Sequence, residues 1–281
     1  MHSVKLVVDS SADMLALEGM PFASVPLKII TAEREYVDDA DLNVEEMVND
    51  LSVYKGRSST ACPSPADWMA AFGDAERVFC VAITSSLSGS CNAAEIAKKD
   101  YEEQYPDRRV CVIDSLSAGP ELRLIAEKIA EMVKAGESFD EICEKVEKYR
   151  KHNTGLVFML ESLKNLANNG RVSPLVAKAA GLLGLRLVGK ASNQGTLEPL
   201  EKCRGERKTL DALRRIMQEL GSKGGKIRIA HVGNLPAAES LKAMLKELWP
   251  TADIRISRCR ALCSFYAEKG GMLIGFEKNI G

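Results

Sequence analysis

The stretch of sequence that decides the fold is Val78-Phe79-Cys80-Val81-Ala82-Ile83-Thr84-Ser85-Ser86-Leu87-Ser88-Gly89-Ser90, an apolar run that ends at a serine-rich loop. The same succession occurs at Val4-Lys5-Leu6-Val7-Val8-Asp9-Ser10-Ser11-Ala12-Asp13 and at Val110-Cys111-Val112-Ile113-Asp114-Ser115-Leu116-Ser117-Ala118-Gly119. Short runs rich in valine and isoleucine that alternate with helical stretches are typical of buried parallel strands. Because open parallel sheets bind ligands beyond the carboxyl ends of their strands, these loops predict a crevice for a small anionic or polar group.

The first half of the chain repeats this strand–helix succession up to residue 152. Apolar residues recur at helical spacing from Leu122 to Val133, and Ser138 with Glu141 has the spacing of a capping box at the start of the next helix. Residues 1–152 are therefore predicted to form a Rossmann-like, doubly wound α/β domain with a parallel sheet.

The second half, residues 153–281, has a different order of elements. Two strand-like runs flank Ser192-Asn193-Gln194-Gly195, which predicts a hairpin over about residues 185–200. An amphipathic helix over residues 210–220 and further strands near residues 227–232, 254–256 and 272–274 follow. The hairpin makes this second α/β domain's sheet mixed or antiparallel, and a ligand is expected between the two domains.

The composition is typical of a soluble globular protein, with 281 residues, 46% hydrophobic and 27% charged residues, and a net charge of −1. This charge gives no overall field that would attract nucleic acid, and no apolar run reaches the ~20 residues that span a bilayer. No signal-peptide pattern precedes the first strand, so a cytoplasmic protein is expected. The eight cysteines form no C-x-x-C pair and the histidines number three, which predicts free thiols and no zinc site.

The loop Ser85-Ser86-Leu87-Ser88-Gly89-Ser90 is the strongest candidate for a binding site. A strand end, a glycine and a helix start bring backbone N–H groups together around an anion. Ser88 would place its hydroxyl at that point, and Gly89 would allow close approach of the backbone. A capped helix start without any ligand explains the pattern equally well, and both glycine-rich phosphate-binding motifs are absent.

A serine nucleophile is disfavoured because the chain has no G-x-S-x-G elbow and no well-placed histidine. His2 is terminal, His152 lies in a predicted linker, and His231 lies on a strand of the second half, where a structural role is favoured.

The alternative function is a metal-dependent enzyme that acts on a small phosphorylated or carboxylated metabolite through Asp9, Asp114 and Ser88. A structural role is favoured for both aspartates, because carboxylates after strands commonly accept hydrogen bonds from loop amides and cap helices.

A further loop precedes a helix that is predicted to begin at Pro65 with Ser64 as its cap. Thr60 would then lie in an extended loop from which its hydroxyl can reach the crevice. Taken alone, this segment predicts a well-capped helix and nothing more.

Seven short motifs occur in order along the chain: Asp9-Ser10-Ser11-Ala12-Asp13, Val25-Pro26-Leu27-Lys28-Ile29, Thr60-x-x-Pro63-Ser64, the Ser85-to-Ser90 loop, Val112-Ile113-Asp114-Ser115, Gly170-Arg171-Val172-Ser173 and Lys202-Cys203-Arg204-Gly205. Their order and spacing resemble those of DegV family proteins, the bacterial fatty acid-binding proteins, over almost the whole chain. The resemblance implies a two-domain α/β protein that holds one long-chain fatty acid between its domains. It also implies a carrier that presents the lipid to a separate fatty acid kinase, and therefore no enzymatic activity, cofactor or metal of its own.

By this resemblance, Thr60 and Ser88 match the positions that bind the carboxylate, with Gly89 and Ser64 in support, and Arg171 lies near the mouth of the site. Hydroxyl groups and a helix N-terminus can hold a carboxylate without an adjacent cation. The acyl chain needs an apolar tunnel. Its expected lining is Phe158, Met159, Leu175, Val176, Ala179, Ala180, Leu182, Leu183 and Leu185.

The chain departs from the family pattern in three places. Cys62 stands where glutamine is usual, and Cys91 where an aromatic residue is usual. The stretch from Ala261 to Gly271, before the last strand, lacks the histidine of the usual histidine-glycine-proline-glycine segment. The carboxylate's third contact is therefore open, whereas the fold and the apolar cavity are expected to be unaffected.

Overall fold

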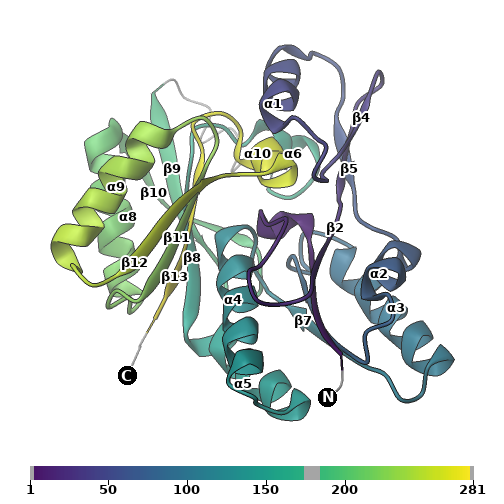
Figure 1. Ribbon diagram of the computed structural model, residues 1–281. Helices are drawn as coiled ribbons and strands as arrows, with labels where there is room; N and C mark the ends of the chain where they lie inside the picture. The colour runs from purple at the N-terminus through teal and green to yellow at the C-terminus, as the bar shows by residue number, and fades with distance from the viewer. Residues whose placement is uncertain (1–2, 174–183, 279–281) are drawn as a thin grey trace.

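The computed structural model describes residues 3–173 and 184–278, which form two large β-sheets with helices packed on them and a small third sheet (Figure 1). Strands of the first large sheet all come from residues before 115, and those of the second all come from residues after 153. Helix α4 (Pro120–Lys134) lies between the two large sheets and contacts β1 and β6 of the first as well as β13, β11 and β8 of the second.

The first sheet has the strand order β2-β1-β6-β7, and each neighbouring pair is parallel. Its strands are β2 (Phe22–Val25), β1 (Val4–Asp9), β6 (Arg77–Ala82) and β7 (Arg109–Asp114). The apolar runs of the sequence thus form adjacent buried strands, and the serine-rich loops follow at one edge of the sheet, as predicted.

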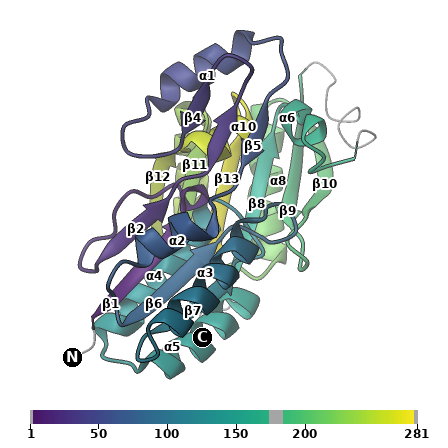
Figure 2. The ribbon, with the colours of Figure 1, turned by 90° about the vertical axis from the view of Figure 1, so that its right-hand side faces the viewer.

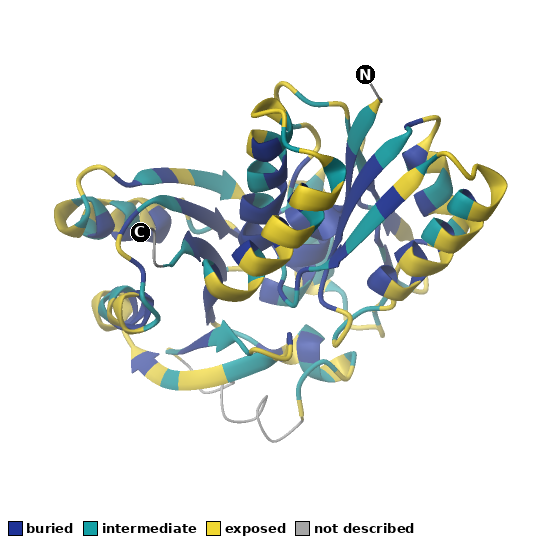
Figure 3. Ribbon diagram, turned by 90° about the horizontal axis from the view of Figure 1, so that it is seen from below, coloured by how far each residue is buried: buried dark blue, intermediate teal, exposed yellow. Residues whose placement is uncertain are grey.

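Helices cover both faces of this sheet, because successive side chains of a strand point to opposite faces. Leu6 and Val8 pack with α4 and α5 (Phe139–His152) on one face. Val7 packs with α2 (Pro65–Phe72) and α3 (Ser90–Gln104) on the other. Figure 3 shows the result, with dark blue residues where helices face the sheet and yellow residues on the outer surface. The first half is a doubly wound α/β arrangement, as predicted.

The second sheet has the strand order β10-β9-β8-β13-β11-β12 and is mixed, because β11 and β12 are parallel and the other pairs are antiparallel. The predicted hairpin is formed by β9 (Leu185–Ala191) and β10 (Leu197–Arg204). The remaining strands are β8 (Thr154–Leu160), β13 (Met272–Glu277), β11 (Lys226–His231) and β12 (Asp253–Arg258).

The two faces of the second sheet have different neighbours. Helices α8 (Glu206–Glu219) and α9 (Leu235–Leu248) pack on one face, over side chains such as Val157 and Met159. Leu156, Phe158 and Leu160 point to the opposite face, towards α10 (Ala261–Ala267) and the first half of the chain. Because alternate residues of β8 point to opposite faces, this strand supplies one wall of the space between the two sheets.

The small third sheet has the order β4-β3-β5, formed by β4 (Glu35–Val37), β3 (Lys28–Ile30) and β5 (Ser59–Ala61). Together with α1 (Val44–Val53), it lies above the first sheet and contacts α10, as Figure 2 shows. The sequence patterns did not predict these elements, because three-residue strands are too short to show an alternation. Thr60 therefore lies in a short strand instead of the predicted extended loop, paired opposite Ile29.

Local signals at helix starts agree with the structure. Ser64 and Ser138 form capping boxes with Asp67 and Glu141. Helix α6 (Lys164–Asn168) is short and follows β8. No helix in the described ranges is long and apolar enough to cross a membrane.

Candidate functional site

The serine-rich loop after β6 is held in place by the buried carboxylate of Asp9. This carboxylate accepts hydrogen bonds from Ile83 N at 2.9 Å, from Ser90 Oγ at 2.7 Å and from Ser11 N at 3.2 Å. Burial raises the pKa of Asp9, and these hydrogen bonds oppose that rise. Asp114 similarly accepts from Ser85 N and from Leu116 N, each at 3.1 Å. Both aspartates therefore hold loop amides, which is the structural role favoured from the sequence.

Ser88 lies on this loop immediately before α3. Its backbone N donates to Thr84 O at 3.2 Å, and its hydroxyl accepts from Ser90 N at 3.3 Å. Gly89 is the N-cap of α3 with an ordinary φ of −75°, so its glycine is not needed for a left-handed backbone. A Cβ at Gly89 would lie 3.1 Å from Cys62 Sγ, which shows how closely the two segments approach. The Ser88 hydroxyl thus lies at a helix N-terminus, where an anion is stabilised.

Thr60 reaches the same site from the third sheet and contacts Tyr266 of α10. The two hydroxyl oxygens, Thr60 Oγ1 and Tyr266 Oη, are 2.7 Å apart. Burial raises the pKa of the Tyr266 phenol, while the hydrogen bond to Thr60 and the charge of Arg171 lower it. The tyrosine therefore keeps its proton at neutral pH and can donate it to an acceptor.

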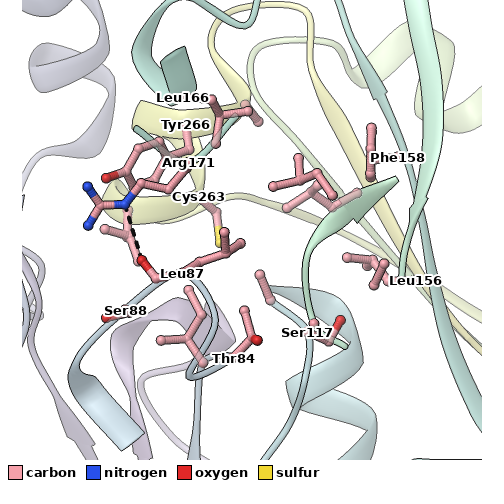
Figure 4. A pocket seen from close by; sticks show the side chains of 18 of the residues that line it. Thr84, Leu87, Ser88, Ser117, Leu156, Phe158, Leu166, Arg171, Cys263 and Tyr266 are labelled. Carbon is pink, nitrogen blue, oxygen red and sulfur yellow. Dashed lines mark hydrogen bonds between the residues drawn. The ribbon is translucent and has the colours of Figure 1, made fainter. Parts of the chain in front are cut away.

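Arg171 completes the polar end of the site. Its Nε donates to Leu87 O at 3.1 Å, and its Nη1 donates to Asn169 O. The centre of its guanidinium group lies 5.9 Å from the Tyr266 ring centroid. Figure 4 shows Arg171 and Tyr266 side by side, with Ser88 and Leu87 below them and the hydrogen bond to Leu87 dashed. Four segments that are distant in the chain, those of Thr60, Ser88, Arg171 and Tyr266, thus bring three hydroxyls and one cation to the wall of one cavity.

Behind this polar end lies a cavity between the two large sheets, with about 820 Å³ of space not filled by protein atoms, part of it open to solvent. Hydroxyl and guanidinium groups come from Thr60, Ser88, Arg171 and Tyr266, with Thr84, Ser117 and Thr196 elsewhere in the wall. The apolar lining comes from Leu27, Ile83, Leu87, Leu156, Phe158, Leu160, Leu166, Leu197, Leu262 and Leu273. Such a cavity suits a ligand with one anionic head and a long apolar body.

The structure brings together most of the predicted site residues but not all of them. Thr60, Ser88 and Arg171 line one cavity, whereas Gly89 follows Ser88 as the N-cap of α3 and is not part of the lining. Ser64 is exposed and caps α2 through Asp67, so it contributes to the cavity only by holding the segment after Thr60.

Of the expected apolar lining, Phe158 faces the cavity, whereas Met159 packs beneath the helices on the opposite face of the sheet. Leu185 is not part of the cavity wall in the described residues. Six expected positions lie outside the described residues: Leu175, Val176, Ala179, Ala180, Leu182 and Leu183.

The histidine and metal hypotheses find no support in the placement of side chains. His231 is buried and accepts a hydrogen bond from Asn234 N at 3.1 Å, as expected for a structural histidine. Within residues 3–173 and 184–278, no group of three or more histidine, cysteine or acidic side chains is arranged to hold a metal ion.

Tyr266 lines the cavity and contacts Thr60, and the sequence patterns missed it as a candidate site residue. It lies in the stretch that lacks the usual histidine, and the only available signal was that a polar aromatic residue occurs there. Its helix, α10, is not predicted by the sequence because its stability depends on distant carboxylates. Asp38 accepts from Ala261 N at 3.1 Å and from Leu262 N at 3.0 Å, which satisfies two N–H groups at the start of the helix.

Asp13 adds a second anchor to α10, since its Oδ1 accepts from Arg260 N at 2.7 Å. Burial raises the pKa of the Asp13 carboxyl to about 7. Helix α10 carries four cavity residues, Leu262, Cys263, Tyr266 and Ala267, so Asp13 and Asp38 position one wall of the cavity.

Comparisons with known proteins give a consistent result. A family model described as "Uncharacterised protein, DegV family" matches residues 3–279. A DegV domain-containing protein of Streptococcus pneumoniae strain R6 is 42% identical over 277 residues, which cover 97% of this chain and 98% of that protein.

Solved structures show the same likeness in three dimensions. A DegV family protein from Eubacterium eligens, loaded with heptadecanoic acid, has a TM-score of 0.96 and 43% identity and covers 98% of this chain and 100% of its own. The Streptococcus pneumoniae Fatty Acid Kinase (Fak) B3 protein, loaded with linoleic acid, has a TM-score of 0.96 and 42% identity and covers 99% and 100%.

Proposed function

This chain belongs to the DegV family, and from this membership we propose that it binds one long-chain fatty acid in the cavity between its two large sheets. The observation that carries the proposal is a single cavity with a polar end at Thr60, Ser88 and Arg171 and an otherwise largely apolar wall. Solved relatives with TM-scores of 0.96 hold a fatty acid, which supports the same ligand class here.

The carboxylate is placed at the polar end. The hydroxyls of Thr60 and Ser88 donate to its two oxygens, and the N-terminus of α3 at Gly89 adds a favourable dipole. Tyr266 supplies a third hydroxyl, because it already contacts Thr60 and keeps its proton. In this chain, the tyrosine thus takes the place of the histidine that is usual in the family.

Arg171 contributes to the site by position and by charge. Its hydrogen bond to Leu87 O holds the serine-rich loop, and its cation lies beside the Tyr266 ring. Ser64 supports the site indirectly, by capping α2 directly after the segment that carries Thr60. Loss of Arg171 or of Ser64 should therefore weaken binding, although neither is proposed as the main ligand of the carboxylate.

The acyl chain is placed against β8 and β13. Leu156, Phe158 and Leu273 face the cavity there. Each methylene moved from water into such surroundings contributes about 0.8 kcal/mol, so the apolar body supplies most of the affinity and the hydroxyls fix the orientation.

We propose that the protein is a carrier that works in the cytoplasm, without a cofactor or catalytic activity of its own. The similar Fak B3 protein of Streptococcus pneumoniae is named as part of a fatty acid kinase, and a kinase subunit is accordingly the proposed partner. The polar end of the cavity is where a carboxylate would be presented to that partner. The two domains are divided at residues 152 and 153, between the end of α5 and the start of β8.

Mass spectrometry of the denatured, purified protein tests the proposal. It should release one fatty acid per chain, and protein stripped of lipid should bind a labelled fatty acid again. Ser88→Ala should weaken this binding by roughly 1–3 kcal/mol, because one headgroup oxygen loses its donor.

Ser138→Ala is the matched control, since Ser138 caps α5 away from the cavity. It should reduce stability by about 1 kcal/mol and leave the affinity unchanged. A protein that is purified empty and that binds no labelled fatty acid would show that the proposed function is wrong.

A further inference from the structure

A second cavity adjoins the apolar one and is lined by both halves of the chain. It has about 900 Å³ of space not filled by protein atoms, part of it open to solvent. Leu156 and Ala191 line both cavities, so the two share part of one wall. The rest of the second wall comes from the loop after β7, the start of α4, the end of α5, the start of β8, the β9–β10 turn and the residue after β13. Most of these side chains are polar, so this cavity does not suit an acyl chain.

Positive charge gathers where α5 ends in this wall. Arg150, Lys151 and His152 are the last three residues of the helix, and all of them line the second cavity. Arg150 is paired with Glu147 in the same wall, and its Nε donates to Glu147 Oε2 at 3.1 Å. Cations in a last helical turn stabilise the helix dipole, which explains these three residues without any ligand. They do not define a binding site by themselves.

Lys278 is a cation of the same wall that the end of α5 does not explain. It directly follows β13 and therefore comes from the other half of the chain. Its side chain lies over Gly155 of β8, where a Cβ would be 2.5 Å from Lys278 Cε and 3.0 Å from Lys278 Nζ. Among the described residues, Lys278 Nζ has no hydrogen-bond or ion-pair partner. Two strands of the second sheet thus direct an unpaired amine into the second cavity.

The carboxyl of Glu121 also lines this cavity, but it does not pair with Lys278. Burial raises the pKa of Glu121, and contacts with the hydroxyls of Ser117 and Thr154 and the charge of Lys278 oppose the rise. Desolvation lowers the pKa of Lys278, and the charge of Glu121 opposes this change. A partly buried ammonium group without a hydrogen-bonded partner is unfavourable, and an anion in the cavity would supply that partner.

We propose that the second cavity binds a phosphate group, either as the free ion or as a small phosphate monoester. Lys278 Nζ is its main contact, and Lys151 and His152 are further donors from the end of α5. Asn193 of the β9–β10 turn adds a side-chain amide to the same wall. Two ammonium groups suit a compact dianion better than a monovalent carboxylate. This site goes beyond the proposed function, because none of these four residues lines the lipid cavity.

Calorimetric titration of the full-length protein in a phosphate-free buffer of low ionic strength tests the inference, since salt screens such a site. The probes are inorganic phosphate, glycerol 3-phosphate as a monoester, and acetate as a monovalent carboxylate. We expect one phosphate per chain and at least tenfold weaker binding of acetate. Glycerol 3-phosphate should bind as tightly as phosphate if the site takes an esterified group, and more weakly if it takes the free ion.

Two substitutions remove a proposed contact. Lys278→Met keeps the apolar stem and should weaken phosphate binding about tenfold or more, as expected for one lost hydrogen bond between charged groups. Lys278→Arg should retain most of the affinity, because it keeps the charge. Lys151 is exposed, so Lys151→Met leaves the packing intact and should weaken phosphate binding several-fold.

Lys148→Met is the matched control, because it removes the same charge from an exposed position of α5 that does not line the second cavity. It should leave phosphate binding unchanged. The inference is wrong if the wild type shows no saturable phosphate binding or binds acetate as tightly as phosphate. It is also wrong if Lys278→Met and Lys151→Met bind phosphate no more weakly than Lys148→Met does. Binding of a fluorescent fatty acid, measured on the same proteins, should be unaltered, and its absence from the wild type would contradict the proposed function alone.

Discussion

Replacing Tyr266 with phenylalanine removes a single oxygen from the polar end of the cavity and leaves the aromatic ring in place. The ring packs edge-on against Phe265, with centroids 4.9 Å apart, so α10 keeps its apolar contacts. The lost oxygen is the one 2.7 Å from Thr60 Oγ1. The substitution therefore tests whether this hydroxyl is the third contact of the carboxylate.

The expected loss of fatty acid affinity depends on what replaces the tyrosine hydroxyl in the ligand-free protein and in the complex. In the ligand-free protein, Thr60 loses one hydrogen-bond partner, but this residue is only partly buried, so water can take the place of the lost contact. In the complex, a carboxylate loses one donor in a site that excludes water, and a hydrogen bond to a charged group contributes about 1.5–3 kcal/mol. We therefore expect Tyr266→Phe to weaken fatty acid binding roughly 10- to 150-fold, since about 1.4 kcal/mol corresponds to a factor of ten.

Displacement of a fluorescent fatty acid from the lipid-stripped protein measures this change. Tyr101→Phe is the matched control, because the Tyr101 hydroxyl donates to Ala75 O at 2.9 Å within the first-half core and does not line the cavity. It should lower the melting temperature and leave the affinity unaltered. An affinity of Tyr266→Phe within twofold of wild type, with the fold intact, would refute the assignment of Tyr266 to the headgroup.

Two other predictions concern stability. Because the pKa of Asp13 is raised from 3.8 to about 7 in the folded protein, the folded state loses stability as the pH rises through this interval, by up to about 4 kcal/mol at 1.36 kcal/mol per unit. Urea unfolding should therefore show that Asp13→Asn becomes more stable relative to wild type as the pH rises from 4 to 7, with no further gain above pH 7. A stability difference that is constant with pH would contradict the raised pKa of Asp13. Gly195, at the tip of the β9–β10 hairpin, has φ +75°, and a Cβ there would lie 2.0 Å from Thr84 Oγ1. Gly195→Ala should lower the free energy of unfolding by about 1–3 kcal/mol and weaken fatty acid binding. Gly136→Ala is the control, because Gly136 also has a positive φ but a Cβ there would have nothing within 4 Å. It should lower stability through backbone strain alone and leave the affinity unchanged.

Much of the fold was predictable from local patterns. The runs that became β1, β6 and β7 are apolar apart from Lys5 and the charged residues at the strand ends, as is typical of strands covered on both faces. The β9–β10 hairpin was recognisable from its glycine-containing turn, and two helix starts from their serine caps. In each case, the determining interactions lie within a few residues along the chain.

The elements that the sequence did not reveal depend on contacts between distant segments. The strands β3, β4 and β5 are three residues long and owe their existence to pairing with one another. Helix α10 begins where it does because Asp38, more than 220 residues earlier, accepts its first N–H groups. Neither feature leaves a periodicity in the sequence, because the energy comes from tertiary hydrogen bonds and packing.

The sequence by itself determined the parallel sheet, its serine-rich loops and the placement of Ser88 at a helix N-terminus, since these follow from local hydrophobic pattern and capping chemistry. Only the tertiary structure decided what stands opposite that loop. Thr60 and Tyr266 are 206 residues apart in the chain, and their hydroxyls meet because two carboxylates in the first half anchor the helix from the second. A binding site between two sheets is a property of their packing, and no single segment of the chain contains it.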